Sequence, residues 1–102
     1  MIIKRKQLEV EEFSYSEKSK FLIRPFPRFT VLDKDKDSER MWLSFDYALQ
    51  GWSGLEEEDG SEFKYTDENK RILFDFIVEV VNFVFEKANE KYIKISESIK
   101  NS

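Results

Sequence analysis

Four consecutive carboxylates, Glu56, Glu57, Glu58 and Asp59, are the densest group of side chains that could do chemistry in this sequence. Carboxylate oxygens suit a hard cation such as calcium or magnesium, provided that they converge on one point. Consecutive residues on a turn point in different directions, so we do not expect these four to share a metal ion. The run predicts a solvated acidic loop, and the alternative is a docking surface for a basic protein.

A second acidic pattern places Asp33, Asp35 and Asp37 at alternate positions, as at the start of an EF-hand calcium loop. That loop requires a glycine at its sixth position and a bidentate glutamate at its twelfth. Ser38 and Ser44 stand at those positions. We therefore interpret the pattern as a polar loop that leads into a helix cap.

The chain contains no histidine and no cysteine. This removes the commonest general base, the thiolate zinc sites and the cysteine nucleophile. Its three glycines lack the lysine and the spacing of a phosphate-binding loop. Because only carboxylate, lysine, tyrosine and serine chemistry remains, we expect a non-enzymatic protein with no catalytic residue, no cofactor and no metal ion.

Length and charge narrow the class of protein further. With 102 residues we expect a single domain over 1–102, with flexible ends at 1–7 and 100–102. A net charge of −4 without a basic face argues against nucleic-acid binding. Since no run of 18 apolar residues and no signal-peptide pattern occurs, we expect no membrane partner and a cytoplasmic location.

Periodicity predicts an α+β fold. Alternating residues at 8–15 and strand formers at 20–26 indicate an N-terminal β-hairpin. Residues 38–50 predict an amphipathic helix, with Gly51 placed to end it in a left-handed cap. The Asp59-Gly60 turn signal predicts a short second hairpin, with arms at 52–55 and 63–65.

The C-terminal third predicts a long helical segment. Thr66 is the expected N-cap, and no proline or glycine follows it. The segment is interpreted either as one bent helix or as two helices that meet near 78–81, where β-branched residues cluster. The apolar residues predicted to form the core are Trp42, Phe45, Leu49, Trp52, Leu73, Phe74 and Ile77.

The second half of this segment has a heptad-like seam. Apolar residues recur with 3-4-3-4 spacing from Phe85 to Ile99, which is typical of a coiled coil. Two interpretations stay open: a homo-oligomer formed through the C-terminal helix, and packing on the domain's own core. The candidate partner-binding residues are Phe85, Tyr92, Ile95, Ile99, Glu56, Glu57, Glu58 and Asp59.

Three stretches, "KFLIRPFPRF", "GWSGLEEEDGSEFKYTDENKRILFDF" and "FVFEKANEK", resemble the small tail assembly chaperones of long-tailed bacteriophages and prophages. The resemblance covers about residues 20–90. The positions that match the family pattern are Trp52, Gly54, Asp59, Gly60, Thr66, Glu68 and Asn69, followed by Leu73 and Phe74.

The resemblance implies a non-enzymatic chaperone that binds the tape measure protein, or another tail protein, during tail morphogenesis. The alternative is a small acidic phage-encoded inhibitor or regulator that binds a host protein. In that case the acidic loop at 56–59 would be the working surface.

Overall fold

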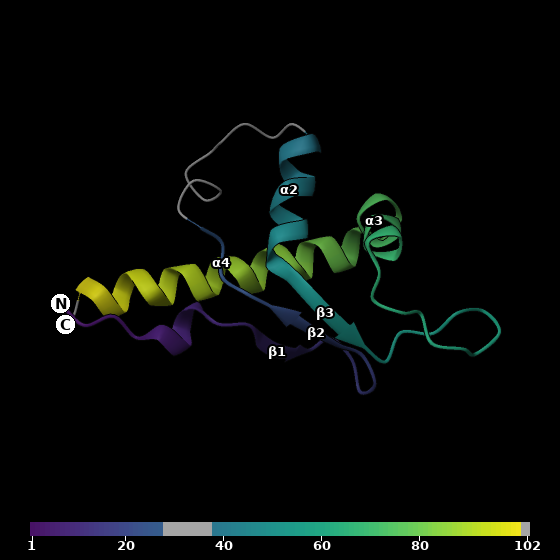
Figure 1. The fold of residues 1–102 in the computed structure, drawn as a ribbon, viewed down its shortest axis with the longest axis horizontal. Coiled ribbons are helices and arrows are strands. Elements are labelled where there is room, and N and C mark those ends of the chain that lie inside the picture. Colours follow the sequence, from purple (N-terminus) through teal and green to yellow (C-terminus); the bar gives the residue numbers. More distant parts are fainter. Residues whose placement is uncertain (28–37, 101–102) are drawn as a thin grey trace.

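The computed structural model describes residues 1–27 and 38–100, which form a three-stranded antiparallel sheet with helices around it (Figure 1). The acidic pattern at 33–37 and residues 101–102 of the predicted flexible end lie outside these ranges. The elements are the 3-10 helix η1 (Arg5–Leu8), β1 (Glu11–Ser14), β2 (Lys20–Ile23), α2 (Ser38–Ala48), β3 (Leu49–Ser53), α3 (Asp67–Phe76) and α4 (Val78–Lys100). The α+β class, the N-terminal hairpin and the long C-terminal helix are confirmed.

The sheet has the order β1-β2-β3, and Phe21 in the central strand pairs with Phe13 on one side and Trp52 on the other. In β2 the side chains of Phe21 and Ile23 are fully buried while Leu22 between them is exposed. The prediction for the first strand was wrong at its start. Residue 8 belongs to η1, and β1 begins only at residue 11, because the chain first turns through the 3-10 helix.

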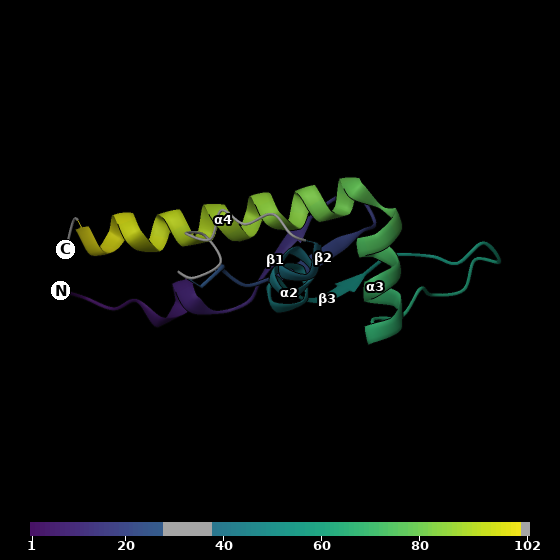
Figure 2. The ribbon, with the colours of Figure 1, turned by 90° about the horizontal axis from the view of Figure 1, so that it is seen from above.

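The longest helix, α4, runs lengthwise beside the sheet (Figures 1 and 2). Its buried stripe includes Val80, Val84 and Ala88, which recur with the helical spacing of one face. These residues join a core that also takes side chains from β2, α2, β3 and α3. The core residues are Phe21, Ile23, Phe26, Phe45, Ala48, Leu49, Trp52, Leu73, Val80, Val81, Val84 and Ala88, with Trp42 and Phe74 partly buried against them.

The helix stop predicted at Gly51 is wrong, because α2 ends at residue 48 and the chain continues directly into β3. Gly51 lies buried inside β3, paired with Leu22. A Cβ atom on this glycine would lie 2.9 Å from Leu22 Cδ1. Leu22 is 36% exposed, so its side chain could move aside, and this contact alone does not require a glycine. Positive φ angles occur instead at Gly54 and Gly60.

The predicted second hairpin is reduced to one isolated bridge, between Glu56 and Glu62. Two backbone hydrogen bonds flank it: Glu57 N donates to Ser61 O at 2.7 Å, and Phe63 N donates to Leu55 O at 2.8 Å. Residue 52, placed in the first arm, lies in β3 and pairs with β2. It contacts the second arm through its side chain, since Trp52 Nε1 donates to Phe63 O at 2.7 Å.

The C-terminal segment forms two helices, and the break falls at Ile77. The predicted cap at the start of α3 is confirmed, since Thr66 Oγ1 accepts a hydrogen bond from Asn69 N at 3.0 Å. Ile77 is 38% exposed, so its place in the predicted core is wrong. It joins α3 to α4 with φ −117° and ψ 80°, and this non-helical conformation takes its side chain out of the helical pattern.

Candidate functional site

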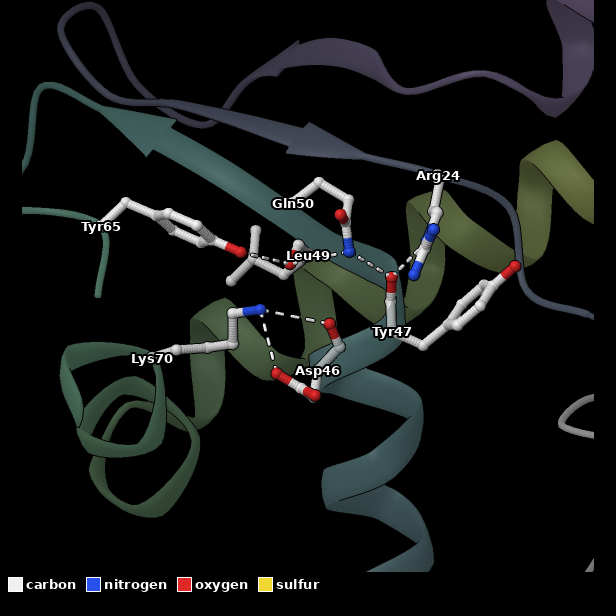
Figure 3. Close-up of polar contacts among 7 residues, drawn as sticks. All are labelled: Arg24, Asp46, Tyr47, Leu49, Gln50, Tyr65 and Lys70. Atoms are coloured by element: carbon white, nitrogen blue, oxygen red, sulfur yellow. Dashed lines mark hydrogen bonds and ion pairs between the residues drawn. The ribbon is translucent and has the colours of Figure 1, made fainter. Parts of the chain in front are cut away.

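The end of α2 carries the densest polar network in the described part of the chain (Figure 3). Helix α2 passes into β3 without a glycine cap, so its last carbonyl groups need other donors. Lys70 Nζ, reaching over from α3, lies 3.2 Å from Asp46 O and 3.0 Å from Asp46 Oδ1. Lys70 is only 3% exposed, so it brings a positive charge to the negative end of the helix dipole from inside the fold.

Three more side chains complete the network around the same helix end (Figure 3). Arg24 Nε and Gln50 Nε2 both donate to Tyr47 O, at 2.6 Å and 2.7 Å. Tyr65 OH donates to Leu49 O at 3.3 Å. The Arg24 guanidinium also stacks on the Tyr47 ring, 3.6 Å from its centroid. These donors satisfy backbone acceptors and join α2 to β2 and α3, which makes the network a structural one.

The acidic run is exposed and lies in the loop that projects at one end of the long axis of the molecule (Figure 1). Asp59 Oδ1 accepts hydrogen bonds from the hydroxyl of Ser61 at 2.6 Å and from its backbone N at 2.9 Å. These bonds hold the pKa of Asp59 below its ordinary value of 3.8, and the hydrogen bond from the Ser61 hydroxyl has the larger effect. Within residues 1–27 and 38–100 no three carboxylates gather closely enough to hold a metal ion.

The heptad-like seam divides between two environments. Its first residue, Phe85, packs edge-on against Phe26, with ring centroids 5.5 Å apart, and also lies 6.4 Å from Phe45. Further along, Tyr92 and Ile95 are half-buried, and Ile99 is 37% exposed. The seam residues therefore do not form one continuous exposed surface.

An exposed apolar surface, which we call the apolar corner, lies where α3 meets α4. Its residues are Ile72, Phe76, Ile77 and Val78, which are 39%, 78%, 38% and 60% exposed. Sequence reasoning missed Phe76 and Val78 as surface residues. The available signal was that this segment is apolar around most of its circumference, because a small domain cannot bury every side of such a helix.

A cleft of about 250 Å³ lies at the other end, between η1, β1 and α4. We call it the N-terminal cleft. Lys91 is 7% exposed, and its Nζ lies 3.0 Å from Glu11 Oε1. The cleft is lined by Lys6, Gln7, Glu11, Phe13, Glu90, Lys91 and Lys94.

Among the described helices none is both long enough and apolar enough to cross a membrane.

Comparison with known proteins identifies the family. No curated protein and no solved structure matches the chain significantly. A family model described as YdaY prophage protein matches residues 5–100, which is nearly the whole sequence. The chain therefore belongs to the YdaY prophage protein family.

Proposed function

We propose that this prophage protein is a non-enzymatic tail assembly chaperone that binds the tape measure protein during tail morphogenesis. The observation that carries the proposal is the apolar corner, where Phe76 is 78% exposed and Val78 is 60% exposed. Contiguous exposed apolar surface on a small domain marks a site of protein interaction. The resemblance of residues 20–90 to tail assembly chaperones supplies the partner.

The apolar corner suits an amphipathic helix as its ligand. Such a helix presents apolar side chains at positions i, i+3, i+4 and i+7, and these anchor in apolar surface on the partner. Complete burial of one phenylalanine or valine side chain is worth about 1.5–3 kcal/mol. A tape measure protein, which is long, helical and apolar along one stripe, would offer this surface repeatedly.

The corner is also fixed in place before any partner binds. Ile77 N donates to Leu73 O at 2.9 Å, and Val80 N donates to Ile77 O at 3.1 Å. Leu73 and Val80 are themselves in the core, 6% and 4% exposed. A preorganised surface loses little conformational freedom on binding, so more of the burial energy contributes to affinity.

The proposal includes a cytoplasmic site of action and a protein partner, with neither nucleic acid nor membrane as a ligand. Co-expression with the tape measure protein of the same prophage tests it. We expect the chain to raise the soluble fraction of the tape measure protein and to copurify with it. We expect Phe76→Asp to abolish both effects, because it places a charge in the contact.

The matched control is Leu43→Asp. Leu43 is 59% exposed and lies on α2, outside the apolar corner. This variant should behave like the wild type. Wild-type chain that neither solubilises nor copurifies with the tape measure protein would refute the proposal, as would equal loss of binding in both variants.

The acidic loop favours a second candidate, an inhibitor that binds a basic surface of a host protein. Glu56, Glu57 and Glu58 are exposed, and no ion pair to any of them forms within the described residues. Here Glu57→Lys with Glu58→Lys should abolish binding of the host protein, while Phe76→Asp should leave it intact. The opposite pattern would exclude this candidate.

A further inference from the structure

The net charge of −4 conceals a strong separation of charge along the chain. Residues 54–68 contain seven acidic side chains and one basic side chain, whereas 1–10 and 87–99 together contain six basic and three acidic ones. The projecting acidic loop lies at one end of the molecule in both views, and the N-terminus and the end of α4 lie at the other (Figures 1 and 2). The longest dimension of the molecule is 51 Å, so these regions are too far apart to neutralise each other within one copy.

The N-terminal cleft has the charge and shape to take a carboxylate. Its two glutamates already have cationic partners: Glu11 lies 3.0 Å from Lys91, and Glu90 lies 3.6 Å from Lys87. Lys6 and Lys94, which line the same cleft, form no ion pair within the described residues. The cleft therefore presents two uncompensated positive charges beside an ion pair whose lysine is buried and whose glutamate is exposed.

The complementary group is on the chain itself. The acidic loop projects into solvent (Figure 1) and is held as a turn by Gly60 N, which donates to Glu57 O at 3.0 Å. A preformed turn docks with little loss of conformational freedom. A cleft of about 250 Å³ has room for one or two carboxylate side chains, but not for a folded element.

We propose that the N-terminal cleft binds the acidic loop of a second copy, so that copies associate head to tail. This contact joins two different surfaces, so it is heterologous and leaves a free cleft and a free loop at the ends of every open oligomer. It is small and dominated by charge, which makes it weak and sensitive to salt. It uses neither the apolar corner nor the tape measure protein, so it can stand or fall independently of the proposed function.

Sedimentation velocity of the full chain tests the contact. We expect the weight-average sedimentation coefficient to rise with protein concentration at low salt. We expect this rise to disappear between about 0.01 M and about 1 M salt, as the Debye length falls from about 30 Å to about 3 Å. Wild-type chain that stays monomeric at low salt and high concentration would overturn the proposal.

Two charge-reversal variants give the sharper test. The cleft variant is Lys6→Glu with Lys94→Glu, and the loop variant is Glu57→Lys with Glu58→Lys. Each variant alone should be monomeric, because one half of the contact is repulsive. An equimolar mixture should associate in alternating order, because the intact loop of the cleft variant fits the intact cleft of the loop variant, and the two reversed surfaces are complementary as well. A chain with all four substitutions should associate again.

Circular dichroism and a thermal melt would establish that each variant is folded, which is expected since the loop glutamates and Lys6 and Lys94 are exposed. The control for net charge is Glu79→Lys with Glu86→Lys, two exposed positions on α4, which should leave self-association intact. A loop variant that still associates alone, or a mixture that remains monomeric, would overturn the proposal. Association that resists salt and is lost in Phe76→Asp would overturn it too, in favour of a dimer through the apolar corner.

Discussion

Truncating two phenylalanines to alanine should separate the residues that hold this fold together from those that it presents to a partner. Phe45 on α2 is 0% exposed, and Phe76 at the end of α3 is 78% exposed. The chemical change is the same in Phe45→Ala and Phe76→Ala. The expected effects on the free energy of unfolding are very different.

For Phe45→Ala the structure predicts a large loss. The ring lies among three others, with centroids 6.3 Å from Trp42, 5.5 Å from Phe74 and 6.4 Å from Phe85. Truncation removes buried apolar surface and leaves a cavity between α2, α3 and α4, at a cost of about 3–5 kcal/mol. In a domain with a total stability of about 5–15 kcal/mol, this is a large part of the whole.

For Phe76→Ala the predicted loss is within about 0.5 kcal/mol. Most of the ring is already in water, so little transfer free energy is lost. Alanine also has a higher helix propensity than phenylalanine, which offsets part of any loss at the end of α3.

Urea denaturation followed by tryptophan fluorescence, together with thermal melts, measures both values. Each kcal/mol corresponds to about 4–8 °C in Tm for a domain of this size. We expect Phe45→Ala to lower Tm by more than about 10 °C, or to prevent folding altogether. Loss of more than about 1.5 kcal/mol in Phe76→Ala would show that this ring is buried and would remove the basis for the apolar corner.

Three further substitutions test particular contacts in the fold. Lys70→Met keeps the buried stem but removes the donor at the end of α2. It should lower the free energy of unfolding, measured by urea denaturation, by about 1–2 kcal/mol. An unchanged value would show that the helix end needs no cation. Thr66→Ala removes the cap of α3 and should cost about 1 kcal/mol, which thermal melts would resolve. Gly54→Ala should destabilise by more than Gly60→Ala. Both residues have positive φ, but only at Gly54 would an added Cβ overlap the carbonyl oxygen of Lys18. Equal Tm values would contradict this.

The sequence prediction was correct where the structure depends on one residue and its immediate neighbours. Thr66 is a capping residue followed by Asp67 and Glu68, and it caps α3 as expected. The Asp59-Gly60 turn also forms, with φ +87° at Gly60. In these places the physics acts over three or four residues, which is the range that a sequence pattern can display.

The end of α2 could not be predicted from local signals. Gly51 has the spacing of a helix stop, yet the helix ends three residues earlier and its carbonyl groups are satisfied by Arg24 and Lys70. These donors are 23 and 24 residues away from their acceptors. Only the tertiary fold brings them together, so no pattern around Gly51 reveals the substitution of side-chain donors for a glycine cap.

The candidate surfaces were predicted in part. The acidic run was expected to be an exposed loop, and its exposure follows from charge alone. The apolar corner was not expected, because a sequence pattern predicts that an apolar residue such as Phe76 is buried in the core. Its exposure depends on the break at Ile77, which sets the direction of α3 relative to α4 and leaves one apolar side of the junction uncovered.

The most direct test of the proposed function is an affinity measurement. Calorimetry would measure how tightly the purified chain binds a purified helical segment of the tape measure protein from the same prophage. The three chains compared would be the wild type, Phe76→Asp and Leu43→Asp. We predict that the wild type binds and that Leu43→Asp binds like the wild type. Phe76→Asp should weaken binding at least about tenfold, which corresponds to about 1.4 kcal/mol. Absence of binding by the wild type, or unchanged affinity in Phe76→Asp, would contradict the claim that the apolar corner is the surface by which this protein recognises a tail component.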